Sequence, residues 1–113
     1  MSSYAVVWQD ELAPGGTAVF AGKLELEESR LRLEGVSRDG RQCRRTVGYD
    51  ELGAVHMAPS GERLVGRPTL VVERPHGLPL RLGTIDGRGA LPELADQLSH
   101  RVLDLMRLHR IAS

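Results

Sequence analysis

Aromatic side chains are scarce in this sequence: one tryptophan, one phenylalanine and two tyrosines supply 4% of its 113 residues. A surface that stacks nucleic-acid bases needs several exposed aromatic rings, so this scarcity speaks against such a platform. It also leaves leucine and valine to fill the core of what its length predicts to be a single domain, residues 1–113. Lysine is scarcer still, because Lys23 is the only lysine among fifteen basic residues.

A surplus of one charge is also missing. Fifteen basic residues balance fifteen acidic residues, whereas nucleic-acid-binding domains normally carry excess positive charge that neutralises phosphates. No apolar run approaches the roughly 20 residues of a membrane span. The N-terminus lacks both the basic region and the long apolar stretch of a signal peptide. We therefore expect a cytoplasmic protein that binds no nucleic acid and does not span a membrane.

Residues suited to metal or covalent chemistry are few and scattered. Cys43 is the only cysteine, which excludes an internal disulfide. Its arginine neighbours could lower the pKa of the thiol, but no partner base is evident and no GxSxG string is present; an ordinary thiol is the alternative. The histidines have neither HExxH nor HxxxH spacing; they are His56, His76, His100 and His109. We expect no metal, no cofactor and no enzymatic activity.

Strand-like segments fill the chain up to about residue 85. Between residues 23 and 36, leucines alternate with charged residues on both sides of a tight connection at Glu28-Ser29, which predicts a hairpin. A second hairpin is predicted around Pro75-His76-Gly77. Pro79 indicates that the last strand lies on a sheet edge or begins there. The seven predicted strands are Tyr4–Trp8, Thr17–Glu28, Arg30–Val36, Arg44–Tyr49, Leu52–Ala58, Thr69–Arg74 and Leu78–Thr84.

The hydrophobic period changes to 3.6 after the strands, which predicts a helix from about residue 90 to about residue 110. Pro92 fits the first turn of such a helix. One apolar stripe consists of Leu91, Leu94, Leu98, Val102 and Leu105. Three further apolar residues lie off this stripe: Leu103, Met106 and Leu108. Because one stripe suffices to cover a sheet, we expect the other three residues to contact a second subunit.

Strands first and one helix last predict a mainly β (α+β) fold. Connections this short cannot be parallel crossovers, so the strands are expected to be antiparallel. We expect bent antiparallel sheets, split near Asp50-Glu51, or a partly open barrel of about seven strands. The C-terminal amphipathic helix would cap the open end with its leucines.

At this point the chain resembles the pleckstrin-homology-like (PH-like) domains, in particular the small bacterial PH-like and GRAM-like domains. The resemblance spans roughly residues 17–102 and rests on Gly22-Lys23-Leu24-Glu25-Leu26, Arg30-Leu31-Arg32-Leu33 and the stretch Thr46–Val55. It implies that the first two stretches are opening strands and that the third leads into a second sheet. The helix lacks the tryptophan often found in eukaryotic members, and Tyr4–Trp8 is an addition without an assigned place.

Phosphoinositide-binding members of that family carry a basic residue on the first strand and a basic pair on the second. Lys23 and the pair Arg30 and Arg32 are in matching places. The connection between them is short and carries Glu27 and Glu28, which would repel a phosphate. We therefore expect a hairpin with charges paired across the strands rather than a lipid site here, and peripheral membrane contact is not the favoured function.

Two functional hypotheses remain. The first is a noncatalytic binding or assembly module that acts through protein contact or homo-oligomerisation, with Leu103, Met106 and Leu108 as its interface. The second is a module for an anionic ligand or lipid headgroup, held through bidentate contacts by Arg38, Arg41, Arg44 and Arg45. A solvated arginine-rich loop is the alternative to this second hypothesis.

Overall fold

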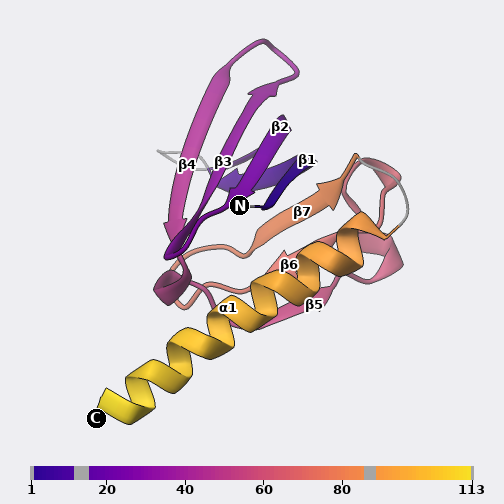
Figure 1. The fold of residues 1–113 in the computed structure, drawn as a ribbon. Helices are drawn as coiled ribbons and strands as arrows, with labels where there is room; N and C mark the ends of the chain where they lie inside the picture. Colours follow the sequence, from indigo (N-terminus) through magenta and orange to yellow (C-terminus); the bar gives the residue numbers. More distant parts are fainter. Residues whose placement is uncertain (1, 12–15, 86–88, 113) are drawn as a thin grey trace.

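The computed structural model describes residues 2–11, 16–85 and 89–112; of these, the side chains of Ser2 and of residues 106–112 are not described. Seven strands in this part of the chain form one antiparallel sheet, and a helix follows them (Figure 1). The elements are β1 (Ser2–Glu11), β2 (Thr17–Leu26), β3 (Arg30–Ser37), β4 (Gln42–Gly48), β5 (Val55–Met57), β6 (Leu70–Val72), β7 (Leu80–Thr84) and α1 (Ala90–Ala112). Three short 3-10 turns connect them: η1 (Tyr49–Glu51), η2 (Ser60–Glu62) and η3 (Leu64–Gly66).

The N-terminal strand β1 lies in the middle of the sheet, whose strand order is β4-β3-β2-β1-β7-β6-β5. It pairs with β2 along its whole length and with β7 from Val6 to Gln9. Alternate residues Tyr4, Val6 and Trp8 are buried, which explains why this segment occupies a central position. The stretches that the family resemblance assigned to the opening strands are therefore the second and third strands.

The sheet is continuous and is not closed into a barrel. The expected division into two sheets near Asp50-Glu51 is wrong, because β1 pairs with strands of both halves. At Asp50 and Glu51 the chain instead forms η1, which connects β4 at one edge of the sheet to β5 at the other. The mainly β fold with one C-terminal helix is as expected.

Both predicted hairpins are confirmed. In the β2–β3 hairpin, Leu24 lies opposite Leu33 and Glu25 lies opposite Arg32. Glu27 Oε1 lies 3.5 Å from Arg32 Nε, so the expected charge pairing is present. In the second hairpin, β7 begins immediately after Pro79 and pairs with both β1 and β6. The proline thus precedes the strand, where no ladder N–H is needed, and β7 is not an edge strand.

Helix α1 packs against η1, β5 and β7, at the open side of the sheet (Figure 1). Polar contacts complement this packing: Gln97 Nε2 donates to the Tyr4 hydroxyl at 3.0 Å, and Arg101 Nη1 donates to the Glu27 carbonyl at 3.1 Å. The Tyr49 hydroxyl donates to the same carbonyl at 2.6 Å. The helix is therefore attached to β1 and to the β2–β3 turn as well as to the core.

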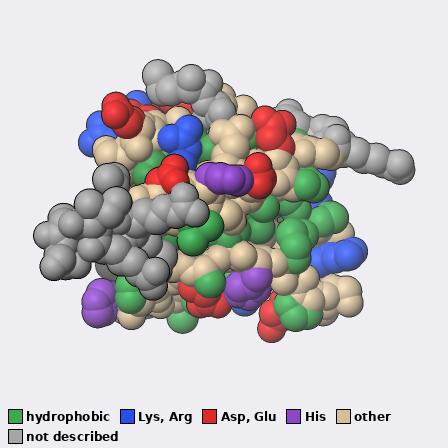
Figure 2. All heavy atoms as spheres, turned by 60° about the horizontal axis from the view of Figure 1, so that its bottom comes forward, with side chains coloured by type: hydrophobic (Ala, Val, Ile, Leu, Met, Phe, Trp, Pro, Cys, Tyr) green, Lys and Arg blue, Asp and Glu red, His purple; other side chains and the backbone are tan. Residues whose placement is uncertain are grey.

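Charged and apolar side chains are interspersed on the surface. On the face drawn in Figure 2, acidic, basic and hydrophobic side chains alternate, and neither charge dominates the part that is coloured. Within the described parts of the chain, no helix combines the length and hydrophobicity that a membrane crossing requires.

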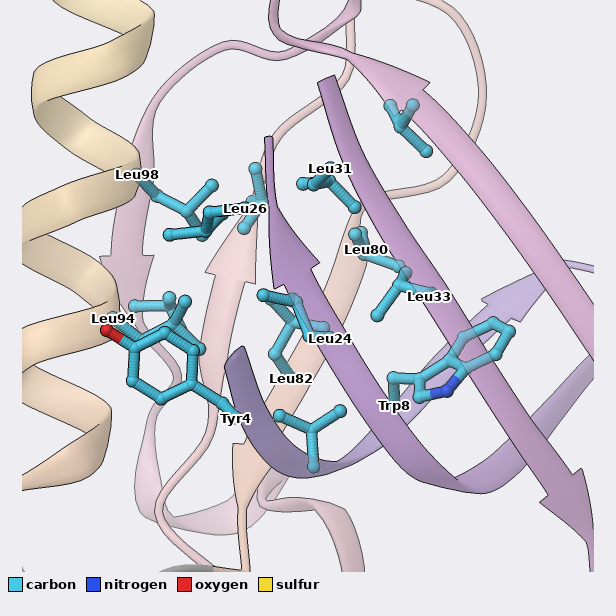
Figure 3. Close-up of a cluster of buried hydrophobic side chains, with 14 of the residues drawn as sticks. Tyr4, Trp8, Leu24, Leu26, Leu31, Leu33, Leu80, Leu82, Leu94 and Leu98 are labelled. Carbon is cyan, nitrogen blue, oxygen red and sulfur yellow. The ribbon is translucent and has the colours of Figure 1, made fainter. Parts of the chain in front are cut away.

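The core lies between the inner face of the sheet and α1 (Figure 3). Leu91, Leu94, Leu98 and Val102 are buried and Leu105 is half-buried, so the predicted stripe is confirmed. Each buried leucine contributes roughly 1.5–3 kcal/mol relative to an exposed one. Of the three apolar residues that lie off the stripe, only Leu103 has a described side chain, and it is exposed. The side chains of Met106 and Leu108 lie outside the described ones.

Candidate functional site

An apolar hollow of about 960 Å³ lies on the outer face of the sheet. Strand residues alternate between the two faces, and at one end of β1, β2 and β3 the outward-facing positions are apolar. Val7 lies opposite Ala21, and Ala21 lies opposite Val36 on the next strand, so the three form a row across the sheet. Val19 and Val65 also line the hollow. We call this hollow the outer groove and define it by Val7, Val19, Ala21, Val36 and Val65.

Val65 is held outward at one side of the outer groove by the turn η3. Leu64 is buried, and its N–H donates to Thr69 Oγ1 at 2.8 Å. Thr69 in turn donates to the Arg67 carbonyl at 2.9 Å, which fixes the turn. The Val65 side chain is 71% exposed and its φ is 50°. A β-branched residue rarely adopts this left-handed conformation, so an exposed apolar side chain is presented here at a cost in backbone energy.

The opposite rim of the outer groove is the turn between β3 and β4. Arg38 and Asp39 line it and supply one positive and one negative charge. The Ser37 hydroxyl donates a hydrogen bond to the Asp39 carboxylate, which lowers the pKa of Asp39 below its ordinary value. Asp39 is therefore ionised at neutral pH, and the rim presents opposite charges on neighbouring residues.

A second hollow of about 290 Å³ continues the outer groove towards the edge of the sheet. It shares Ala21 and Val36 with the outer groove and extends to Gln42 and Arg44 on β4. The outer face is therefore hollowed from Val65 to the exposed edge strand. We call this second hollow the edge hollow.

A third cavity, of about 450 Å³, lies between β4, η1 and the end of β1, and we call it the ion-paired cavity. Asp10, which is 4% exposed, accepts a hydrogen bond from Arg74 Nη2, and its other carboxylate oxygen lies 3.4 Å from Arg45 Nε. The two arginines thus share one carboxylate, which links β1, β4 and the β6–β7 connection. Asp50 and Glu51 also line the cavity, so it is not a positively charged site.

The predicted anion-binding arginines all lie on the β3–β4 hairpin but do not converge on one point. Arg38 and Arg41 belong to the turn. Arg44 points to the outer face, where its Nε lies 4.0 Å from Glu34 Oε1. Arg45 lies opposite buried Leu33 and so points inward, towards Asp10. Consecutive strand residues face opposite sides, which separates Arg44 from Arg45.

The other residues with chemical potential are dispersed. Cys43 is half-buried against the core. His56 Nε2 lies 2.9 Å from Glu73 Oε1, and this hydrogen bond raises the pKa of His56. Lys23 Nζ is bound to Glu25 Oε1 at 2.6 Å. Among the residues that the structure describes, no group of three histidine, cysteine or acidic side chains is arranged to hold a metal ion.

The outer groove was missed by the sequence reasoning, which assigned the apolar surplus to the helix alone. A signal was present in Thr17–Ala21, because the apolar residues Ala18, Val19, Phe20 and Ala21 are consecutive and therefore occur on both faces of β2. A strand with only one buried face alternates instead. No comparable pattern in the sequence indicates that η3 adds Val65 to the outer groove.

No protein-family model matches the chain, and no curated protein matches it either. Its function is therefore inferred from the geometry of the outer groove, the edge strand and the ion-paired cavity.

Proposed function

We propose that the protein is a noncatalytic PH-like assembly module that binds a second copy of itself through the outer groove. The observation that carries this proposal is the presence of a protruding apolar side chain, Val65, beside an apolar hollow on the same face. A two-fold contact uses the same patch on both subunits, so it requires a projection and a recess on one face. Val65 of each copy would enter the hollow of the other.

The charges of the rim have a defined place in such a contact. Val65 and the rim formed by Arg38 and Asp39 are on opposite sides of the outer groove, so a two-fold contact places the rim of each copy beside the η3 turn of the other. Val36, whose side chain is 45% exposed, would be covered in the centre of such a contact. Apolar surface that is removed from water contributes roughly 25 cal/mol per Å².

Kinship with the bacterial PH-like domains is part of the same proposal. It is supported by the sheet of seven antiparallel strands, its open side and the single C-terminal helix that packs there. A cytoplasmic location is proposed as well, and the free thiol of Cys43 is compatible with a reducing compartment.

The alternative, an anionic ligand on the arginines of the β3–β4 hairpin, has less geometric support. Arg45 is engaged with Asp10, and Arg44 points to the opposite face. The predicted helix interface also remains a prediction, because Leu103 is its only member with a described side chain. Leu103 therefore provides a competing interface for the experiment below.

Sedimentation equilibrium over a concentration series tests the proposal with two matched variants. Val65→Asn removes the apolar projection and suits the left-handed conformation, so the subunit stays folded. We expect the wild type to dimerise, Val65→Asn to remain monomeric up to at least tenfold higher concentration, and Leu103→Asn to dimerise like the wild type. A monomeric wild type, or dissociation caused only by Leu103→Asn, would contradict the outer groove as the interface.

A further inference from the structure

Strand β4 forms an exposed edge of the sheet. It is the terminal strand in the sheet order, and among the described residues its only strand partner is β3. The opposite terminal strand, β5, spans only Val55–Met57, and α1 packs against it. Strand β4 spans seven residues, Gln42–Gly48, and is the longer of the two edges. An exposed edge of this length can accept another strand.

The direction of the β4 backbone groups follows from the hydrogen bonds at its two ends. The Tyr49 N–H donates to the Ser29 carbonyl at 3.2 Å, and the Arg41 carbonyl accepts from the Ser37 N–H at 2.8 Å. Odd-numbered residues therefore direct their backbone groups towards β3. Because the direction alternates along an antiparallel strand, those of Gln42, Arg44 and Thr46 face the exposed edge.

The ends of this edge are not equally available. At the η1 end, the Gly48 N–H already donates to Glu51 Oε2 at 2.8 Å. Further along, the Arg44 carbonyl accepts only a long hydrogen bond of 3.4 Å from Arg45 Nη1. The stretch that is free to pair with an added strand is therefore Gln42–Thr46, the half of β4 nearer to the β3–β4 turn.

Charge along the edge selects the partner. The Arg44 side chain is 85% exposed, and neither Arg38 nor Arg41 has an ion pair among the described residues. An antiparallel pair of two β4 strands over Gln42–Thr46 would place the two copies of Arg44 opposite each other, and the repulsion opposes that pairing. Carboxylates of an added strand would instead meet the guanidinium group of Arg44, whose ion pair with Glu34 is a long one of 4.0 Å. Near Thr46 an uncharged residue of the partner is favoured instead, because Asp50 and Glu51 would repel a carboxylate.

Space is available on both sides of an added strand. The edge hollow reaches Gln42 and Arg44 on the outer face. The ion-paired cavity is lined by Arg45, Thr46 and Val47 on the other side. Since side chains of a strand alternate between its two faces, successive residues of the partner would enter the edge hollow and the cavity in turn.

We propose that the β4 edge binds an extended acidic segment of another protein by strand addition, with carboxylates beside Gln42 and Arg44 and uncharged residues beside Thr46. This interaction is separate from self-association, because it uses the backbone of an edge strand and not the outer groove. The protein would thus have two interaction surfaces, one for its own copy and one for a partner.

NMR titration of the full-length ¹⁵N-labelled protein tests this proposal with a nine-residue probe peptide. The probe alternates threonine and valine, carries three glutamates in one half and is blocked at both ends. We expect shift changes and slower hydrogen exchange at the amides of Gln42, Arg44 and Thr46. A second peptide with the same charges but N-methylated at every residue has no backbone N–H to donate to β4, so it should bind at least tenfold more weakly.

Two variants separate strand addition from simple charge attraction. Thr46→Pro removes an N–H that faces the edge and leaves the ladder to β3 intact, so it should abolish binding while the fold persists. Arg44→Glu should weaken binding about tenfold, whereas Arg63→Glu, the same charge change on the η2–η3 loop, should not. The spectrum of each variant without peptide confirms that it is folded.

Three results would overturn the proposal. The first is that Thr46→Pro binds the probe as tightly as the wild type does, or that the N-methylated peptide binds as tightly as the probe. The second is the absence of binding to the probe at millimolar concentration, while vesicles containing phosphatidylserine bind in a manner that depends on Arg44. The third is a site for the probe in the outer groove. Because Val65→Asn disrupts only the outer groove, repeating the titration with this variant distinguishes failure of strand addition from failure of self-association.

Discussion

At the scale of single residues, Val65 departs most from what its residue type prefers. Its φ of 50° lies in the left-handed region, and its side chain is exposed. Neither property stabilises an isolated subunit, since a β-branched residue in this conformation costs roughly 1–3 kcal/mol and an exposed valine gains little from burial. A contact that covers the side chain would explain why valine occupies a position that suits glycine or asparagine.

The backbone conformation of Val65 leads to a prediction about stability. Replacement by asparagine should raise the free energy of unfolding by about 1 kcal/mol, because asparagine adopts the left-handed conformation more readily. The measurement is urea unfolding at low micromolar concentration, where dimerisation contributes least. The matched control is Val36→Asn, at an extended strand position of the same groove, which should bring no gain. Equal effects of the two substitutions would contradict the cost assigned to φ.

The pair of His56 and Glu73 gives a prediction about pH. The hydrogen bond that His56 donates to the Glu73 carboxylate raises the pKa of His56 above its ordinary value of 6.5. The resulting stabilisation is fully present below the unfolded pKa and is lost as the pH rises through the folded pKa. In an NMR titration, Glu73→Gln should therefore lower the pKa of His56. An unchanged pKa in that variant would show that the pair does not form in solution.

At the scale of elements, the hairpins and the helix stripe could be predicted because their patterns are local. The β2–β3 register follows from leucines at alternate positions on both sides of the short connection at residues 27–29. The place of β1 could not be predicted in the same way. Its partner β7 is more than seventy residues away along the chain, and nothing within Tyr4–Trp8 specifies that pairing.

The two faces of α1 give a prediction at this scale. Leu98 is fully buried and Leu103 is exposed, although both are leucines on the same helix. Leu98→Ala should lower the free energy of unfolding by roughly 2–5 kcal/mol, because it leaves a cavity in the core. Leu103→Ala should change it by less than about 0.5 kcal/mol. Denaturant unfolding of both variants at low concentration measures the difference. Similar losses at both positions would contradict the orientation of the helix.

At the scale of the whole molecule, the fold separates the core from two candidate interaction surfaces. The inner face of the sheet and α1 form the core, the outer face carries the outer groove, and β4 leaves one edge exposed. Sequence composition indicated a domain without catalytic residues, but it could not locate either surface. Both arise from segments that are distant in sequence, such as η3 beside β1. Of the predicted arginines, Arg44 is retained in the edge proposal, whereas Arg45 is engaged with Asp10.

Self-association through the outer groove is the central claim, and intermolecular NOEs test it most directly. The sample is an equal mixture of isotope-labelled and unlabelled protein at a concentration above the dimerisation midpoint. The account predicts isotope-filtered NOEs between the Val65 methyl groups of one copy and Val36 or Val19 of the other. Intermolecular NOEs that involve only Leu103 and its neighbours on α1, or none at any concentration, would contradict it.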